Sequence, residues 1–148
     1  MSERLKDLLV AGPATGRRAT AALGARLAAG TIFVAFGAGK FTSHASEVSS
    51  FETYGLPSPD VFVYAIGALE VVGGVLLIAG LATRLASLVL AGDMIGAIVV
   101  SGIAQGELIS LTLAPALLLV NLFLLWTGPG RYSLDRRLAG GPTPRPAA

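Results

Sequence analysis

Four long apolar stretches separated by short polar segments dominate the chain. They run over residues 21–41, 61–82, 85–104 and 108–127. Each has about the length that a helix rising 1.5 Å per residue needs to cross the roughly 30 Å hydrocarbon core of a bilayer. Because the connections between them are short, the sequence predicts an all-α membrane protein, an antiparallel bundle of four transmembrane helices.

The second stretch has the best-marked ends. Ser58 is a candidate N-cap, Pro59 suits a first helical turn, and Asp60 favours the positive end of the helix dipole. Thr83 and Arg84 are expected to end this helix on the other side. The spacing therefore predicts a helix that crosses the bilayer with slight tilt.

The remaining segments divide the chain around the membrane domain, residues 21–138. Residues 1–20 are predicted to be a cytoplasmic N-terminal tail, and residues 139–148, rich in proline, glycine and alanine, a disordered C-terminal tail. A secretory signal peptide is the alternative interpretation of the first apolar stretch. That stretch ends in Lys40 without a small-residue cleavage pattern, and three more spans follow, which favours a transmembrane helix.

The first connection, residues 42–58, contains a short apolar pattern. Val48, Phe51 and Tyr54 recur at a spacing of three, which predicts a short interfacial helix ending at Gly55. His44 lies in the same segment and is interpreted as a hydrated loop residue.

Composition supports the membrane assignment and excludes several functions. The chain is 53% hydrophobic and only 14% charged, against about a quarter charged in soluble domains. It has no cysteine and one histidine, which excludes disulfides, thiolate metal sites and histidine metal clusters. No motif for flavin, haem or iron–sulfur binding is found, and Gly37–Lys40 lacks the spacing of a Walker loop. With a net charge of +2 and scattered basic residues, nucleic acid is not an expected partner.

The basic residues predict the orientation in a bacterial-type inner membrane. With both termini in the cytoplasm, Lys40 is the only one of the 11 basic residues on the outer side. The outer connections then carry acidic residues, which are Glu47, Glu52, Asp60 and Glu107.

Each span also carries a polar side chain that is expected to face the bundle interior. An ionised carboxylate at the bilayer centre costs on the order of 3 kcal/mol, so such groups are protonated, paired or hydrated. They form the predicted intramembrane polar site: Arg26 and Lys40 in the first span, Glu70 in the second, Asp93 in the third and Asn121 in the fourth.

Side-chain direction suggests how these groups pair. Helical side chains lean toward their own N-terminus, so Lys40 and Glu70 lean toward each other. Arg26 and Asp93 are the second expected pair, and Asn121 an interhelical hydrogen-bond donor. Because Glu70 and Asp93 are placed at different depths, paired-carboxylate chemistry is not favoured. Ion pairs that serve only packing and topology are the alternative, and no catalytic residue is assigned.

Glycines repeat at helical spacing in the first three spans. Small residues let two helices approach closely, so we expect a packing role for them, and the GxxxG face also offers an oligomer contact. The expected packing glycines are Gly30, Gly37, Gly67, Gly74, Gly92 and Gly96.

Several of these segments together resemble the DoxX family. The similarity covers about residues 24–138 and is carried by RLAAGTIFVAFGAGK at 26–40, FETYGLPSPD at 51–60, ALEVVGGVLLIAGLATRLASLVLAGDMIGA at 68–97 and GPGRYSLDRRL at 128–138. The resemblance implies a small four-helix inner-membrane protein, some of whose relatives are linked to quinone-coupled redox complexes. The family offers no agreed catalytic residues for this chain.

Three functions remain open. The first is a membrane subunit of a redox complex, non-catalytic or interacting with a quinone, in which a partner protein supplies the electron carriers. The second is a small-solute or proton-linked carrier, and the third is a structural or assembly factor. Copurified quinone, uptake by proteoliposomes and loss of partner assembly would favour the first, second and third in turn.

Overall fold

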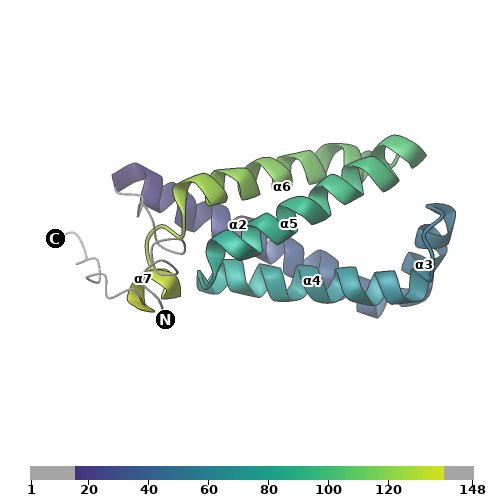
Figure 1. The fold of residues 1–148 in the computed structure, drawn as a ribbon, viewed down its shortest axis with the longest axis horizontal. Helices are drawn as coiled ribbons and strands as arrows, with labels where there is room; N and C mark the ends of the chain where they lie inside the picture. Colours follow the sequence, from purple (N-terminus) through teal and green to yellow (C-terminus); the bar gives the residue numbers. More distant parts are fainter. Residues whose placement is uncertain (1–15, 139–148) are drawn as a thin grey trace.

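A computed structural model describes residues 16–138, and its helices cross the molecule in four long antiparallel segments (Figure 1). Four helical stretches, residues 16–42, 59–79, 83–103 and 108–127, are long and apolar enough to span a membrane. The predicted all-α, four-span bundle is confirmed. In chain order the elements are α2 (Gly16–Thr42), α3 (His44–Thr53), α4 (Pro59–Ala79), α5 (Thr83–Ala97), the π-helix η1 (Ile98–Ile103), α6 (Leu108–Thr127) and α7 (Leu134–Leu138).

The long helices form two pairs, α2 with α4 and α5 with α6. The pairs are close together at the end where α7 lies and diverge toward the end where α3 crosses the molecule (Figure 1). We call these the α7 end and the α3 end. The short helix expected in the first connection is therefore present as α3, although it begins at His44. The predicted disordered tail, 139–148, and residues 1–15 lie outside the described residues.

The expected end of the second span is wrong. α4 ends at Ala79, because Gly80 adopts φ +67° and closes a Schellman motif, with Gly80 N–H donating to Leu77 O and Leu81 N–H to Leu76 O. Thr83 therefore begins α5 and does not end α4.

At the other end of α4, Ser58 does not cap the helix with its side chain. It has φ +51°, and its carbonyl accepts hydrogen bonds from the N–H groups of Val61 and Phe62. The expected Pro59 does occupy the first turn.

Glycines set the close approach of α2 and α4. A Cβ atom added at Gly30 would lie 2.7 Å from Gly74 O, and one added at Gly37 would lie 2.8 Å from Gly67 O. These contacts are too short for any side chain, so the two backbones touch at both points. The two points are seven residues apart on each helix, or about two turns.

Gly92 and Gly96 behave differently from the other expected packing glycines. A Cβ added at either would meet nothing within 4 Å. They therefore do not pack helices together within the described chain.

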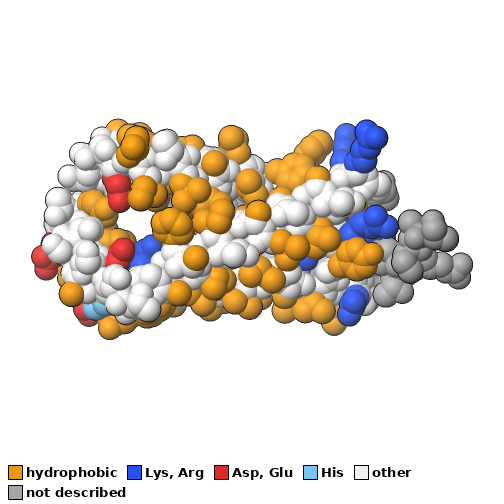
Figure 2. Space-filling model, turned by 180° about the vertical axis from the view of Figure 1, so that it is seen from behind, with side chains coloured by type: hydrophobic (Ala, Val, Ile, Leu, Met, Phe, Trp, Pro, Cys, Tyr) orange, Lys and Arg blue, Asp and Glu red, His pale blue; other side chains and the backbone are white. Residues whose placement is uncertain are grey.

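The apolar core lies between the helix pairs toward the α7 end. It contains Phe33, Leu77, Leu90, Leu117 and Leu124, all buried. Large apolar side chains also cover much of the outer surface (Figure 2). A membrane protein presents such side chains to lipid.

Candidate functional site

A cavity of about 440 Å³ lies where the two helix pairs diverge. Figure 2 shows the molecule hollowed near the α3 end, with charged side chains at the edge of the hollow. Most of its wall is apolar and aromatic, and the lining includes Phe33, Phe36, Phe51, Phe62, Met94 and Leu117. Its charged lining residues are Lys40, Glu47, Glu70, Asp93 and Glu107.

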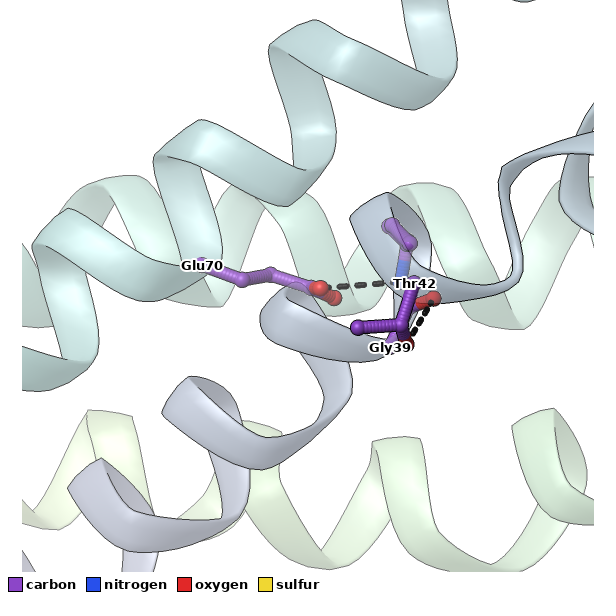
Figure 3. A network of polar contacts seen from close by, with 4 residues as sticks. Gly39, Thr42 and Glu70 are labelled. Carbon is purple, nitrogen blue, oxygen red and sulfur yellow. Dashed lines mark hydrogen bonds and ion pairs between the residues drawn. The ribbon is translucent and has the colours of Figure 1, made fainter.

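The predicted ion pair between Lys40 and Glu70 is present in this cavity. Lys40 Nζ donates to Glu70 Oε2 at 2.8 Å, and the side chains are 12% and 6% exposed. Figure 3 shows Glu70 extending from α4 toward α2, beside the hydrogen bond from Thr42 Oγ1 to Gly39 O. The glycine contacts position the pair, because a Cβ at Gly37 would lie only 2.9 Å from the Cβ of Glu70.

Asp93 lies in the same cavity as this pair. Its Oδ2 is buried and accepts no hydrogen bond from the described residues. Both Glu70 and Lys40 are close enough to act on it electrostatically. The expectation that Glu70 and Asp93 occupy separate depths is therefore wrong, since α4 and α5 run in opposite directions and both residues lie near the middle of their helices.

The predicted pairing of Arg26 with Asp93 is also wrong. Arg26 is fully buried near the α7 end, where its guanidinium donates to backbone carbonyls. Nε donates to Leu77 O at 2.9 Å and Nη2 to Ile78 O at 3.3 Å, which satisfies carbonyls at the end of α4. Nη1 donates to the carbonyls of Pro129 and Arg131 in the loop after α6. Arg26 therefore joins three segments of the fold.

Asp135 makes the complementary contact at the same end. Its Oδ1 accepts from Ala82 N–H at 2.6 Å and its Oδ2 from Thr83 N–H at 2.9 Å, so it caps the start of α5. Its own N–H donates to Gly80 O at 2.9 Å. Gly80 also has no room for a side chain, because a Cβ there would lie 2.6 Å from Arg26 Cζ. We call Arg26, Gly80 and Asp135 the α7-end clamp, and its contacts hold the bundle together.

Asn121 contributes within its own helix. It is fully buried, and its Nδ2 donates to Leu117 O at 2.9 Å. The expected interhelical donation is wrong, because the amide reaches the carbonyl one turn earlier in α6.

His44 is more structured than the expected loop residue. Its Nε2 lies 2.7 Å from Asp60 Oδ1, and its ring stacks on Tyr64 with centroids 4.1 Å apart. These contacts fix the start of α3 against the start of α4.

A second polar group lines the cavity at the α3 end. Tyr54 Oη donates to Glu107 Oε2 at 3.4 Å and Ser110 Oγ donates to the same oxygen at 2.7 Å. Ser101 in η1 lies 2.6 Å from Ser110, Oγ to Oγ. Burial is the largest cause that raises the pKa of Tyr54 above its ordinary value of 10.0, and the neighbouring Glu107 carboxylate is the second.

Sequence reasoning did not place these residues in the site. The sequence indicates Glu107 and Glu47 only as charges on the outer connections. One available signal was the polar spacing of Ser101, Glu107 and Ser110 on both sides of one short turn.

The cavity therefore combines apolar walls with polar groups at two levels. Lys40 supplies hydrogen-bond donors, Asp93 has an unengaged oxygen, and the pair Glu70–Asp93 can hold or release protons. The lining residues Phe36, Phe62 and Ile109 are exposed, and the hollow is visible from a long side of the molecule (Figure 2). Such an arrangement can bind a molecule with an apolar body and a polar head.

Comparison with known proteins agrees with the resemblance read from the sequence. The sequence model of the DoxX family matches residues 21–102. An uncharacterized membrane protein of Mycobacterium tuberculosis, Rv3486, is 36% identical over 133 residues, covering 77% of this chain and 78% of the relative. The putative oxidoreductase CatD of Bacillus subtilis is 34% identical over 110 residues, covering 74% of this chain and 81% of the relative. No solved structure matches significantly.

Proposed function

The chain belongs to the DoxX family of membrane proteins, and on that premise we propose that it is a quinone-binding membrane subunit of a redox complex. The observation that carries the proposal is the cavity, which places Lys40, Glu70 and Asp93 together in a largely apolar space that is visible from a long side of the molecule (Figure 2). The relative that is named a putative oxidoreductase also supports a redox role.

The residues present fit a quinone. The cavity volume of about 440 Å³ lies within the range of small-molecule sites, and its aromatic walls suit a flat ring with an apolar tail. Lys40 Nζ has two N–H bonds beyond the one that it directs to Glu70, so it can donate to a ring carbonyl. Asp93 Oδ2 has no partner among the described residues and can accept from a ring hydroxyl.

When bound, a quinone would supply two-electron, two-proton redox chemistry, with the electrons provided by a partner oxidoreductase. The chain's own residues bind the ring and handle protons. With all three ionised, Lys40, Glu70 and Asp93 carry one uncompensated negative charge, which one bound proton neutralises. The cluster thus holds one exchangeable proton beside the ring, while Phe33 and Leu117 form part of the apolar wall against which the ring would pack.

Quinone binding by the purified protein tests the proposal. We expect quinone in lipid extracts of protein purified in mild detergent. Binding of added quinol, whose ring hydroxyl donates to Asp93, should be weakened about tenfold by Asp93→Asn, since loss of a charge-assisted hydrogen bond costs about 1.5 kcal/mol. Asp60→Asn is the matched control, because Asp60 pairs with His44 outside the cavity. Absence of quinone binding, or equal effects of both variants, would overturn the proposal. Proton-coupled uptake by proteoliposomes without quinone would favour the carrier function.

We also propose an orientation in a bacterial-type inner membrane, with the α7 end in the cytoplasm. Basic side chains gather at that end of the molecule (Figure 2), and the positive-inside rule then places both termini in the cytoplasm. They include Arg17, Arg18, Arg84, Arg131, Arg136 and Arg137. Reporter fusions at each terminus test this, and activity of a periplasmic reporter at either would overturn it.

A further inference from the structure

The polar lining of the cavity continues from the intramembrane cluster to the α3 end. From this we infer that the cavity is filled by water from the α3 end through an acidic entrance, formed by Glu47 and Glu107, that admits protons and small cations to the cluster. The inference rests on the proposed function in one respect. If a quinone binds in the cavity, its protons exchange with water on the α3 side of the membrane.

The first support is continuity. One cavity is lined by Lys40, Glu70 and Asp93 in its deep part and by Tyr54 and Glu107 at the α3 end. Ser101 and Asp93 lie eight residues apart along α5 and η1, or about 12 Å of helix. A water molecule takes up about 30 Å³ in the liquid, so a cavity of about 440 Å³ has room for a chain of waters across that gap.

The second support is the network at the entrance. Glu107 is exposed to solvent, yet its Oε2 accepts from Tyr54 and Ser110, and Ser110 is buried beside Ser101. Hydroxyl groups can both donate and accept, so the chain Glu107–Ser110–Ser101 can pass a proton inward from bulk water. Tyr54 and the bond from Gln105 Nε2 to Thr53 O at 3.3 Å hold the end of α3 against the α5–α6 connection.

The third support is the sign of the charge. The cavity is lined by four carboxyl groups, those of Glu47, Glu70, Asp93 and Glu107, and Lys40 is the only basic residue among its described lining. A narrow space lined by one sign of charge with low-dielectric walls concentrates counter-ions. The entrance is therefore expected to favour cations over anions.

Cysteine labelling tests the water path directly, because the natural chain has no cysteine. Gly96→Cys places a thiol in the cavity, where a Cβ meets nothing within 4 Å. Ile95→Cys is the matched control, since Ile95 is adjacent, half-exposed and outside the cavity lining. Thiosulfonate reagents react with thiolates, which form in water and not in lipid.

We expect membrane-impermeant thiosulfonates added on the α3 side to label Gly96→Cys at least tenfold faster than Ile95→Cys. The expected preference for a cationic over an anionic reagent at Gly96→Cys is about tenfold. Glu107→Gln should lower that preference at least threefold, whereas Glu52→Gln, on the exposed face of α3 outside the cavity, should leave it within twofold. Gly92→Cys, which also lines open space, repeats the test if Gly96→Cys folds poorly.

Three results would overturn the inference: equal labelling at positions 96 and 95, faster labelling from the α7 side, or a charge preference unchanged by Glu107→Gln. None of them depends on quinone. Labelling as expected in a protein that binds no quinone would support the water-filled entrance and contradict the proposed function. Quinone binding in a protein whose cavity cysteine is not labelled would support the proposed function and contradict the entrance.

Discussion

Removing the charge of Glu70 should destabilise the protein strongly. Glu70→Gln keeps the size of the side chain and an oxygen for Lys40, but leaves the Lys40 ammonium, which is only 12% exposed, without its counter-charge. Breaking a buried ion pair by removing one partner costs about 3–5 kcal/mol. Because Asp93 lines the same cavity and is already within electrostatic reach of Lys40, part of the loss is compensated. We therefore expect a loss of about 3 kcal/mol in the free energy of unfolding.

The assay is reversible unfolding in mixed micelles, followed by helical circular dichroism as the denaturing detergent is increased. A double-mutant cycle with Lys40→Met isolates the pair. Removing both charges restores a neutral interior, so the double variant should be more stable than Glu70→Gln, with a coupling energy of at least about 2 kcal/mol. Glu52→Gln is the control, because it removes an exposed carboxylate near the α3 end. It should change the free energy of unfolding by less than about 0.5 kcal/mol.

A loss below about 1 kcal/mol for Glu70→Gln, together with additive effects in the cycle, would refute this reasoning. It would mean that the water inferred in the cavity solvates the Lys40 ammonium as fully as bulk water does, so that the pair contributes no more than a surface ion pair.

Three further predictions follow from the contacts at the two ends of the bundle. Arg26→Lys should cost about 2–4 kcal/mol in the same unfolding assay, because one ammonium cannot reproduce a guanidinium that donates to four carbonyls; a loss below 1 kcal/mol would contradict the clamp. Gly74→Ala should cost about 1–3 kcal/mol, since its Cβ would lie 2.7 Å from a backbone oxygen of α2, whereas Gly92→Ala, in open space, should be neutral or stabilising; equal effects would contradict the packing described. Glu107→Gln should lower the raised pKa of Tyr54, measured by phenolate absorbance with the chain's other two tyrosines replaced by phenylalanine; an unchanged pKa would show that Glu107 does not contribute to the shift. The raised pKa keeps the Tyr54 phenol protonated in the folded state. The contribution of the protonated phenol to the free energy of unfolding is therefore full below the ordinary value of 10.0 and is lost as the pH rises through the folded-state pKa.

The parts of the fold that were predicted correctly depend on local properties of the chain. The four spans follow from the length of the apolar stretches, and α6 has the predicted bounds, Leu108–Thr127. The Lys40–Glu70 pair was predicted because both side chains lie on consecutive antiparallel spans and lean toward each other. The end of α4 was misplaced because the apolar pattern continues past Gly80, where the backbone turns.

The errors in the candidate site concern partners from distant parts of the chain. The expected pairing of Arg26 with Asp93 follows from side chains that lean toward the cytoplasm from the inner half of the membrane. Arg26 instead binds carbonyls that come together only when the loop after α6 folds back onto α4. The role of Asp135 is missed for the same reason, since the N–H groups of Ala82 and Thr83 become its partners only when that loop docks. The sequence contains all of these residues without indicating that they meet.

The sequence by itself determined that the chain is a four-span membrane protein, because the cost of exposing backbone and charge to lipid depends on composition and length alone. It also determined the Lys40–Glu70 pair. Only the tertiary structure decided that Asp93 and Glu107 line the same cavity as that pair. The physical reason is that a cavity depends on the angle between helices: contacts at Gly30 and Gly37 hold α2 against α4, the α7-end clamp closes one end, and the helix pairs diverge at the other.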